Sequence, residues 1–234
     1  LMPKYGFISE RKYILREVIR LKDIPVIFDN TKHIINMKSC FIPETRVQVY
    51  FLENNSLYKS LPDLIYKARN GRVFSDLDER FAFFSLSAID TLTSLFWAPD
   101  IFICNDWQTS FVPALLNDKF KQEDFYAKMK TVYILHSIND YSYASKEVYD
   151  MLGLAPNSSE KLINNHISAV ENSDLTIVMN YESTNLLENL KKEETLYKTI
   201  KSNEFLIIDI PKKSNREAWK DAAATIKSSC EKLR

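Results

Sequence analysis

His136 is the side chain in this sequence with the clearest chemical potential. It directly follows Thr131–Leu135, an apolar run that predicts a buried strand, so a loop there can direct the imidazole into a crevice. A neutral imidazole in such a place can donate to a ligand hydroxyl or stabilise charge that develops in a transition state. The alternative is a histidine that is hydrogen-bonded in the loop wall. We interpret His33 and His166 as structural or incidental.

A second polar group follows another predicted strand. Ile101 to Cys104 predict a short buried strand, and a helix is expected from about Trp107 to Leu116. Five side chains that could bind a ligand lie at this junction: Asn105, Asp106, Trp107, Gln108 and Thr109. Because open α/β sheets bind ligands at the carboxyl ends of their strands, we expect this group and His136 to line one crevice.

Each member of this group also has a purely structural interpretation. Asp106 can cap the helix, while Asn105, Gln108 and Thr109 can satisfy backbone amides at the turn. Trp107 can pack in the core or rim instead of serving as an aromatic platform for a ring-shaped ligand.

Three candidates come from elsewhere in the chain. Lys4 and Tyr5 lie in the loop after the first strand, on the same predicted sheet edge as Asp106. Arg80 lies one turn into a long predicted helix. It either contributes to binding or pairs with Glu79 or with a carboxylate at the sheet edge.

Strands and helices alternate along the chain. The predicted strands are Ile24–Phe28, His33–Met37, Val47–Leu52, Ile101–Cys104, Lys128–Leu135, Asp174–Met179 and Phe205–Ile210. Helices are predicted over Ser9–Arg20, Asp76–Leu95, Trp107–Leu116, Val148–Pro156, Glu182–Leu190 and Asn215–Lys232. Residues 54–76 read as an irregular excursion over the surface, and Lys191–Lys201 as a solvated face. The alternation predicts an α/β fold, with a doubly wound, mostly parallel sheet covered by helices on both faces, in a single domain over residues 1–234.

The composition excludes several classes of function. Lys and Arg total 31, as do Asp and Glu, so a net charge of zero gives no reason to expect a nucleic-acid or membrane partner. Three widely spaced cysteines fit a reducing, cytoplasmic location. No Cys, His or Asp spacing suggests a metal site. With three glycines in 234 residues, the chain has no glycine-rich phosphate loop.

The first residues read like the end of a strand that enters a loop. Leu1 and Met2 run directly into Pro3–Gly6. We therefore expect an N-terminal strand and loop to precede this sequence.

Several motifs resemble bacterial glycogen and starch synthases. They are MPKYGFI at Met2–Ile8, VQVYF at Val47–Phe51, DERFAFFS at Asp78–Ser85, PDIFICNDWQT at Pro99–Thr109 and SDLTIV at Ser173–Val178. The resemblance covers roughly residues 1 to 190 and is specific, because the motifs keep both their sequence and their order. The last strand and helix, within residues 195–234, match nothing in that family.

The resemblance implies a retaining glucosyltransferase with two Rossmann-like domains and an active site between them. Such enzymes move glucose from ADP-glucose or UDP-glucose, as co-substrate and without another cofactor, onto an α-1,4-glucan. This chain is similar to the N-terminal domain, which mainly holds the acceptor. By that resemblance Asp106 and Trp107 match an acceptor-side element, and His136 matches a histidine that contacts the transferred sugar.

The chain also departs from the family pattern. After His136 it reads S-I-N-D-Y-S, without the Asn, Gln and Gly of the family loop. The family's nucleotide-binding C-terminal domain would have to come from a second chain or an absent segment. The alternative is a non-enzymatic glucan-binding or regulatory module derived from a synthase.

Overall fold

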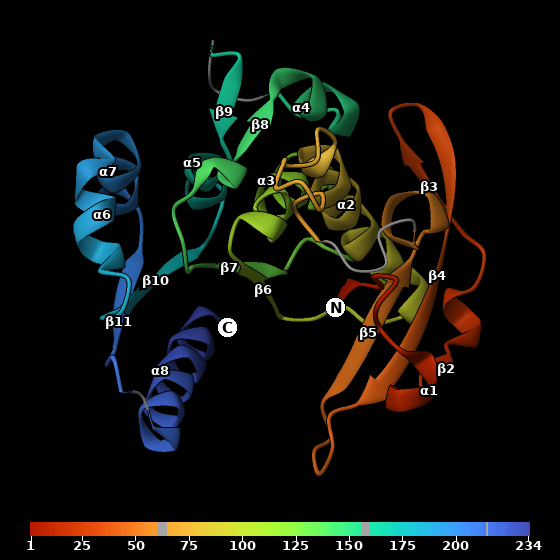
Figure 1. Ribbon diagram of the computed structural model, residues 1–234, viewed down its shortest axis with the longest axis horizontal. Coiled ribbons are helices and arrows are strands. Elements are labelled where there is room, and N and C mark those ends of the chain that lie inside the picture. The colour runs from red at the N-terminus through yellow and green to blue at the C-terminus, as the bar shows by residue number, and fades with distance from the viewer. Residues whose placement is uncertain (60–64, 156–159, 214) are drawn as a thin grey trace. The chain divides into compact units, whose positions relative to one another are not determined.

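The computed structural model describes residues 1–59, 65–155, 160–213 and 215–234. The chain divides into two compact units, Leu1–Trp97 and Ala98–Arg234. Each unit has its own sheet and is described by itself (Figure 1).

The described residues of the first unit form a mixed sheet. Its strands are β1 (Met2–Pro3), β2 (Arg16–Glu17), β3 (Ile24–Phe28), β4 (Thr31–Phe41) and β5 (Gln48–Glu53). They follow the order β1-β5-β4-β2, and β3 also pairs with β4. The predicted strands Ile24–Phe28 and His33–Met37 pair as an antiparallel hairpin, because Asp29 and Asn30 both take positive φ angles and so form the tight turn that favours antiparallel strands.

Helices complete the first unit. α2 (Leu77–Leu95) confirms the predicted long helix, and its Phe83 ring contacts Phe28 and His33. The other helical segments are α1 (Glu10–Tyr13), a 3-10 turn at Ile19–Leu21 and a π-helical turn at Asn55–Lys59. That last turn opens the segment predicted as an irregular excursion, of which residues 60–64 lie outside the described part.

The prediction of one helix over Ser9–Arg20 is wrong. Ser9 is the N-cap, as expected, and its side chain accepts from the Lys12 amide. The helix ends because Ile14 adopts a left-handed conformation, with φ at 51°, and the chain then enters β2 to pair with β4. Tertiary pairing therefore overrides a helical spacing of apolar residues.

The second unit contains the predicted parallel sheet. Its strands are β6 (Ile101–Asn105), β7 (Lys130–Leu135), β10 (Leu175–Tyr181) and β11 (Phe205–Ile210), in the order β11-β10-β7-β6. The interpretation of β6 as a buried strand is wrong, since β6 is an edge strand and Ile103 is 42% exposed. A run of apolar residues does not show whether a strand lies in the middle or at the edge of a sheet.

Helices cover both faces of this sheet (Figure 1). α8 (Arg216–Leu233) packs on one face through Ala222, Ile226 and Leu233. α3 (Phe111–Leu115), α5 (Asn165–Glu171), α6 (Leu186–Lys192) and α7 (Glu194–Ser202) lie on the other side, together with α4 (Lys146–Leu152) and the antiparallel pair β8 (Tyr143–Ser145) and β9 (Leu162–Asn164). The expected α/β class, with a parallel sheet between helices, is confirmed.

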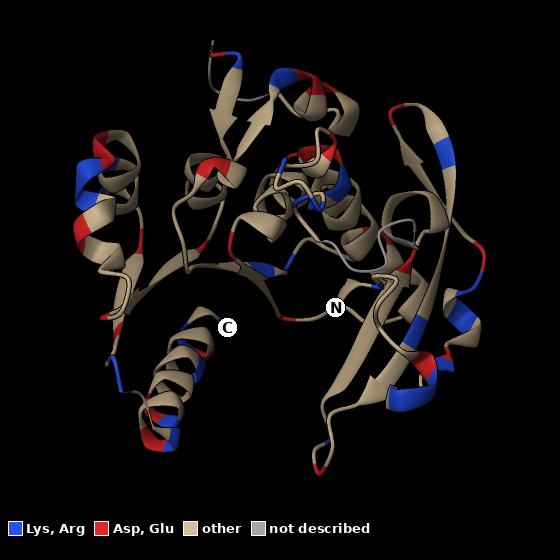
Figure 2. Ribbon diagram, viewed as in Figure 1, with Lys and Arg blue, Asp and Glu red and all other residues tan. Residues whose placement is uncertain are grey.

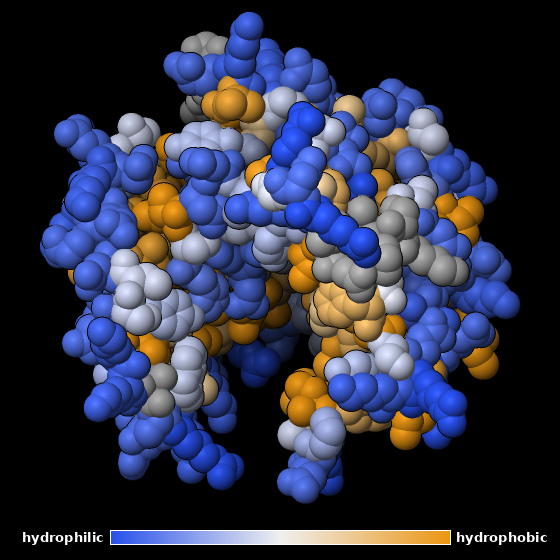
Figure 3. Space-filling model, viewed as in Figure 1, coloured by the Kyte–Doolittle hydropathy of each residue, from blue (hydrophilic) through white to orange (hydrophobic). Residues whose placement is uncertain are grey.

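The interpretation of Lys191–Lys201 as a solvated face needs correction. Leu196 and Ile200 of α7 are buried, so one side of this helix belongs to the core. Its outer side, like that of α6, is hydrophilic (Figure 3). Basic and acidic residues are interspersed there and on α8 (Figure 2).

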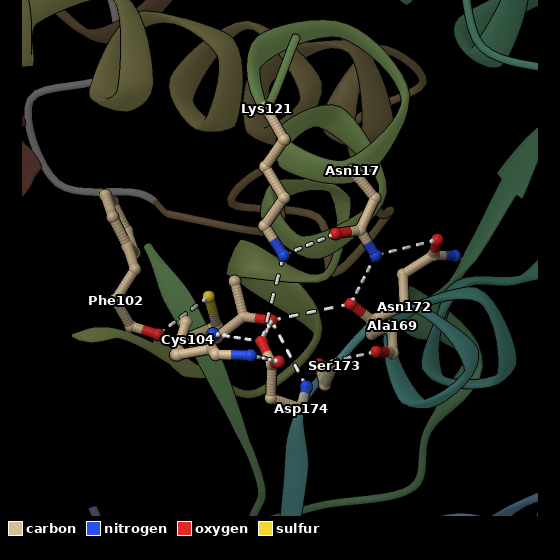
Figure 4. A network of polar contacts seen from close by, with 10 residues as sticks. Phe102, Cys104, Asn117, Lys121, Ala169, Asn172, Ser173 and Asp174 are labelled. Carbon is tan, nitrogen blue, oxygen red and sulfur yellow. Dashed lines mark hydrogen bonds and ion pairs between the residues drawn. The ribbon is translucent and has the colours of Figure 1, made fainter. Parts of the chain in front are cut away.

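Asp174 holds the amino-terminal end of β7. Its Oδ2 accepts from the Thr131 amide at 2.8 Å, and its Oδ1 accepts from Lys130 Nζ at 2.9 Å. Asn117 and Lys121 extend this network from the helical segment above it (Figure 4). Although burial opposes the shift, the Thr131 amide and Lys130 hold the pKa of Asp174 below its usual value. The SDLTIV motif therefore has a structural role.

We predict that Asp174→Ala lowers the free energy of unfolding by about 2 kcal/mol, because the buried Thr131 amide loses its acceptor. Urea denaturation measures this change. Asp124→Ala, which removes the same charge from an exposed position, is the matched control. Equal stability of the two variants would contradict the assignment.

Candidate functional site

Asp106 joins the ends of β6 and β7. Its Oδ1 accepts from the His136 and Ser137 amides, both at 3.2 Å, and its Oδ2 accepts from Ser137 Oγ at 2.6 Å. The side chain makes no cap bond to the following helical turn, Trp107–Thr109. The interpretation of Asp106 as a helix cap is therefore wrong, and the predicted meeting of the two strand ends is confirmed.

The backbone of Asp106 is strained. Its φ of 57° and ψ of −171° lie next to a region that glycine alone occupies readily. Strain of this kind costs about 1–3 kcal/mol and persists only where the surroundings over-determine it. Here the Asp106 amide donates to the Ile134 carbonyl at 2.8 Å, while the side chain is held by the loop after β7.

His136 lies at the same sheet edge with both ring nitrogens in hydrogen bonds. Nδ1 lies 2.7 Å from the Tyr181 hydroxyl, and Nε2 lies 3.2 Å from Asn105 Oδ1. The Tyr181 ring stacks on the imidazole, with 6.0 Å between centroids. Burial lowers the pKa of His136, while the Asp106 carboxylate acts in the opposite direction. The imidazole is therefore neutral at pH 7 and can donate one hydrogen bond.

Sequence reasoning missed Tyr181 and Ser137. Tyr181 ends β10, which pairs with β7 in parallel, so it reaches the same edge as His136. Ser137 is the residue after His136 in a loop that departs from the family pattern, and its hydroxyl bonds the candidate carboxylate.

The other candidate residues on this edge make contacts within the protein or are partly buried. Thr109 donates from its backbone and its hydroxyl to the Asp106 carbonyl, so it supports the turn. Trp107 is 4% exposed and its ring lies 5.6 Å from that of Tyr141. Gln108 is half-buried in the same turn.

Lys4 and Tyr5 do not share a sheet with Asp106, so that expectation is wrong. β1 pairs in parallel with β5 in the mixed sheet. Lys4 Nζ lies 2.9 Å from Glu10 and 3.2 Å from Glu53. Tyr5 is buried and stacks on Phe7.

Arg80 is also engaged within the first unit. It pairs with Asp76 at 2.6 Å, not with Glu79, and donates to the Leu57 carbonyl. It also lies over the Phe74 ring.

A second tyrosine–histidine pair lies inside the second unit. Tyr133 of β7 and His166 of α5 are fully buried, and the Tyr133 hydroxyl lies 2.6 Å from His166 Nδ1. His166 Nε2 finds no hydrogen-bond partner among the described residues. Burial lowers the pKa of His166 to about 4.

Among residues 1–59, 65–155, 160–213 and 215–234, no three His, Cys, Asp or Glu side chains gather closely enough to hold a metal ion. No helix within those ranges is both long enough and apolar enough to cross a membrane.

The family of starch synthase catalytic domains matches residues 1–189 of this chain, across both units. The chain belongs to this family. The resemblance in the five sequence motifs is thereby confirmed, and the family is one of glycosyltransferases.

Curated relatives of this starch synthase-type chain are bacterial glycogen synthases. That of Pelodictyon phaeoclathratiforme is 31% identical over 180 residues, which are 75% of this chain and 37% of the relative. That of Chlorobaculum parvum is 36% identical over 147 residues, which are 59% of this chain and 28% of the relative. The chain thus spans about a third of the length of these relatives.

A solved structure supports the fold. The catalytic domain of starch synthase IV from Arabidopsis thaliana, bound to ADP and acarbose, aligns with a TM-score of 0.65 at 22% identity. The alignment covers 88% of this chain and 43% of that one. The Rossmann-like α/β fold is therefore shared.

We predict that Asp106→Gly is more stable than Asp106→Ala by about 1 kcal/mol, because only glycine relieves the backbone strain. Both variants lose the same hydrogen bonds, so urea denaturation of the pair isolates the strain. In an unstrained segment alanine is normally the more stable of the two. If Asp106→Ala is the more stable variant, the proposed backbone strain at residue 106 is refuted.

We predict that His166 makes stability depend on pH. Since its pKa falls from about 6.5 unfolded to about 4 folded, the unfolded chain binds its proton first as the pH drops. Stability is therefore fully present above pH 6.5 and decreases by about 3 kcal/mol as the pH approaches 4. Denaturation of wild type and His166→Gln across this range measures it, and the variant should show the smaller slope. Equal slopes would contradict the assignment.

Proposed function

We propose that this chain supplies the sugar-binding edge of a glucosyltransferase that moves glucose from a nucleotide-glucose to an α-1,4-glucan. The observation that carries the proposal is the half-buried His136, which is held at the carboxyl edge of a parallel sheet by Asp106 at its amide, Tyr181 at Nδ1 and Asn105 at Nε2. Family membership supports the reaction class. The Arabidopsis neighbour, bound to ADP and acarbose, supports a nucleotide and a sugar as ligands.

The proposed roles follow from the contacts. His136 donates from Nε2 to an oxygen of the transferred sugar, and Asp106 holds the loop that carries it. Asn105, Gln108 and the Trp107–Thr109 turn form the acceptor side of the edge. Lys4, Tyr5 and Arg80 stay sequence predictions as substrate contacts, because each has partners inside the first unit.

The remaining catalytic group is proposed to come from beyond this sequence. Departure of a nucleotide diphosphate needs stabilisation by cationic groups. The charged side chain that bonds His136 and Ser137 is instead an anion, the Asp106 carboxylate. A further segment or a second chain would supply the cations, and no cofactor besides the nucleotide-glucose is required. We also propose that the two units act as one domain, since the family match runs through both.

A second candidate function is a glucan-binding or regulatory module without transferase activity. The observation that favours it is the loop after His136, which reads S-I-N-D-Y-S and lacks the Asn, Gln and Gly of the family loop. This candidate requires glucan binding but no nucleotide-glucose binding.

Calorimetry with maltopentaose and with ADP-glucose separates these candidates. We expect maltopentaose to bind, and His136→Ala to weaken that binding roughly tenfold, as the loss of one well-placed hydrogen bond implies. His136→Gln, which keeps an N–H donor, should retain more affinity. A labelled-glucose transfer assay with glycogen, with and without cell extract, then tests for catalysis.

Each outcome assigns the function. Transfer of label in either condition supports the glucosyltransferase. Maltopentaose binding with neither ADP-glucose binding nor transfer supports the binding module. No binding of either ligand overturns both candidates.

A further inference from the structure

The two tyrosine–histidine pairs share one contact but differ in their surroundings. In each, a tyrosine hydroxyl lies 2.6 or 2.7 Å from a histidine Nδ1. His166 is fully buried and its Nε2 has no partner in the described part of the chain, whereas His136 is half-buried and its Nε2 faces Asn105. Only the Tyr181–His136 pair places a ring nitrogen at the sheet edge where ligands bind in such folds.

The partners of His136 determine where its single ring proton resides. Asn105 Oδ1 can only accept a hydrogen bond, so the proton between these groups belongs to His136 Nε2. Nδ1 then offers a lone pair, which the Tyr181 hydroxyl satisfies as donor. Burial and the Asp106 carboxylate raise the pKa of Tyr181, so its hydroxyl keeps the proton that it donates.

We propose that Tyr181 is a positioning residue that fixes His136 in the Nε2–H tautomer and thereby makes the imidazole a hydrogen-bond donor, not a base, toward a ligand oxygen. Asn105 occupies that donor in the free protein, and the ligand oxygen replaces it. The identity of the ligand as a glucan or nucleotide-glucose rests on the proposed function. The tautomer does not depend on it.

The ring of Tyr181 is itself braced. Its centroid lies 6.0 Å from that of His136, with an interplanar angle of 24°, and 6.2 Å from that of Trp219. Trp219 belongs to α8, which lies outside the residues that the family matches. His136 is therefore supported in part by a residue that lies outside the family match.

Removal of the Tyr181 hydroxyl should affect both the tautomer and the titration of His136. Without a donor at Nδ1, the Nδ1–H form is no longer disfavoured and the neutral ring loses a stabilising bond. The groups that face the ring are Asp106 and Asn105 from the end of β6 and Tyr181 from the end of β10. Since Asp106 is unchanged in Tyr181→Phe, a rise in the His136 pKa reports the lost hydroxyl.

Nitrogen NMR of protein labelled with ¹⁵N-histidine tests the proposal directly. The chain has three histidines, and His136→Gln assigns the signals of interest. In the wild type we expect a protonated, pyrrole-type Nε2 and an unprotonated, pyridine-type Nδ1 at His136. In Tyr181→Phe the two signals should move toward each other, and the His136 pKa should rise.

Two matched variants make the same chemical change elsewhere. Tyr133→Phe removes the hydroxyl that contacts His166, and Tyr149→Phe removes one that donates to Asn165. We expect Tyr133→Phe to change the His166 signals alone and Tyr149→Phe to change neither pair of signals. Retained amide spectra establish that each variant is folded.

The results that test the positioning role can be distinguished from those that test the proposed function. A pyrrole-type Nδ1 in the wild type, or unchanged His136 signals in folded Tyr181→Phe, overturns the positioning role. If the tautomer depends on Tyr181, maltopentaose should shift the Nε2 signal and bind Tyr181→Phe about fivefold to tenfold more weakly. A Tyr181-dependent tautomer without any response to maltopentaose or ADP-glucose upholds the positioning role and refutes the proposed function.

Discussion

The candidate site depends on one carboxylate. Asp106 is the last polar group before the turn that follows β6, yet both of its oxygens bond residues that follow β7. It therefore converts two adjacent strand ends into one rigid edge, and it does so from a backbone conformation that a residue with a side chain rarely adopts. The positions of His136 and Ser137 follow from this interaction.

β7 is held in the same manner at both ends. Asp174 accepts from the amide of Thr131, near the start of the strand, and Asp106 accepts from the amide of His136, directly after it. In both cases a carboxylate from a neighbouring segment replaces the missing acceptor of a strand terminus. The first contact lies at the opposite end of β7 from the candidate site and is structural, whereas the second is part of that site.

Much of the fold could be predicted from local pattern. The strands β3, β4 and β11 and the helix α2 were found because short apolar runs identify strands and helical spacing of apolar residues identifies a helix. The pairing of strands that are far apart in the sequence was harder to predict. Nothing local shows that Ile14 turns left-handed so that β2 can join β4, or that β6 lies at an edge.

The candidate site, like the fold, could be predicted only in part. Asp106 and His136 were found because each directly follows a strand of one parallel sheet, but their hydrogen bonds were not foreseen. Tyr181 was missed because its predicted strand stopped at Met179, two residues before the hydroxyl that matters. Lys4 and Tyr5 were placed on the wrong sheet, since the pairing of β1 with β5 leaves no trace in the sequence around them.

The order of the strands also has a consequence for how the site arises during folding. β6, β7 and β10 are neighbours in the sheet, but their contacts at the edge join residues 30 and 45 positions apart. As the chain leaves the ribosome from its N-terminus, Asp106 emerges first, its partners in the β7 loop second, Tyr181 third and the bracing Trp219 last. Closure of each of these loops carries an entropic cost that only the packed sheet recovers. A nascent chain that ends before α8 would therefore carry every motif of the family match but would lack Trp219, whose ring packs near that of Tyr181.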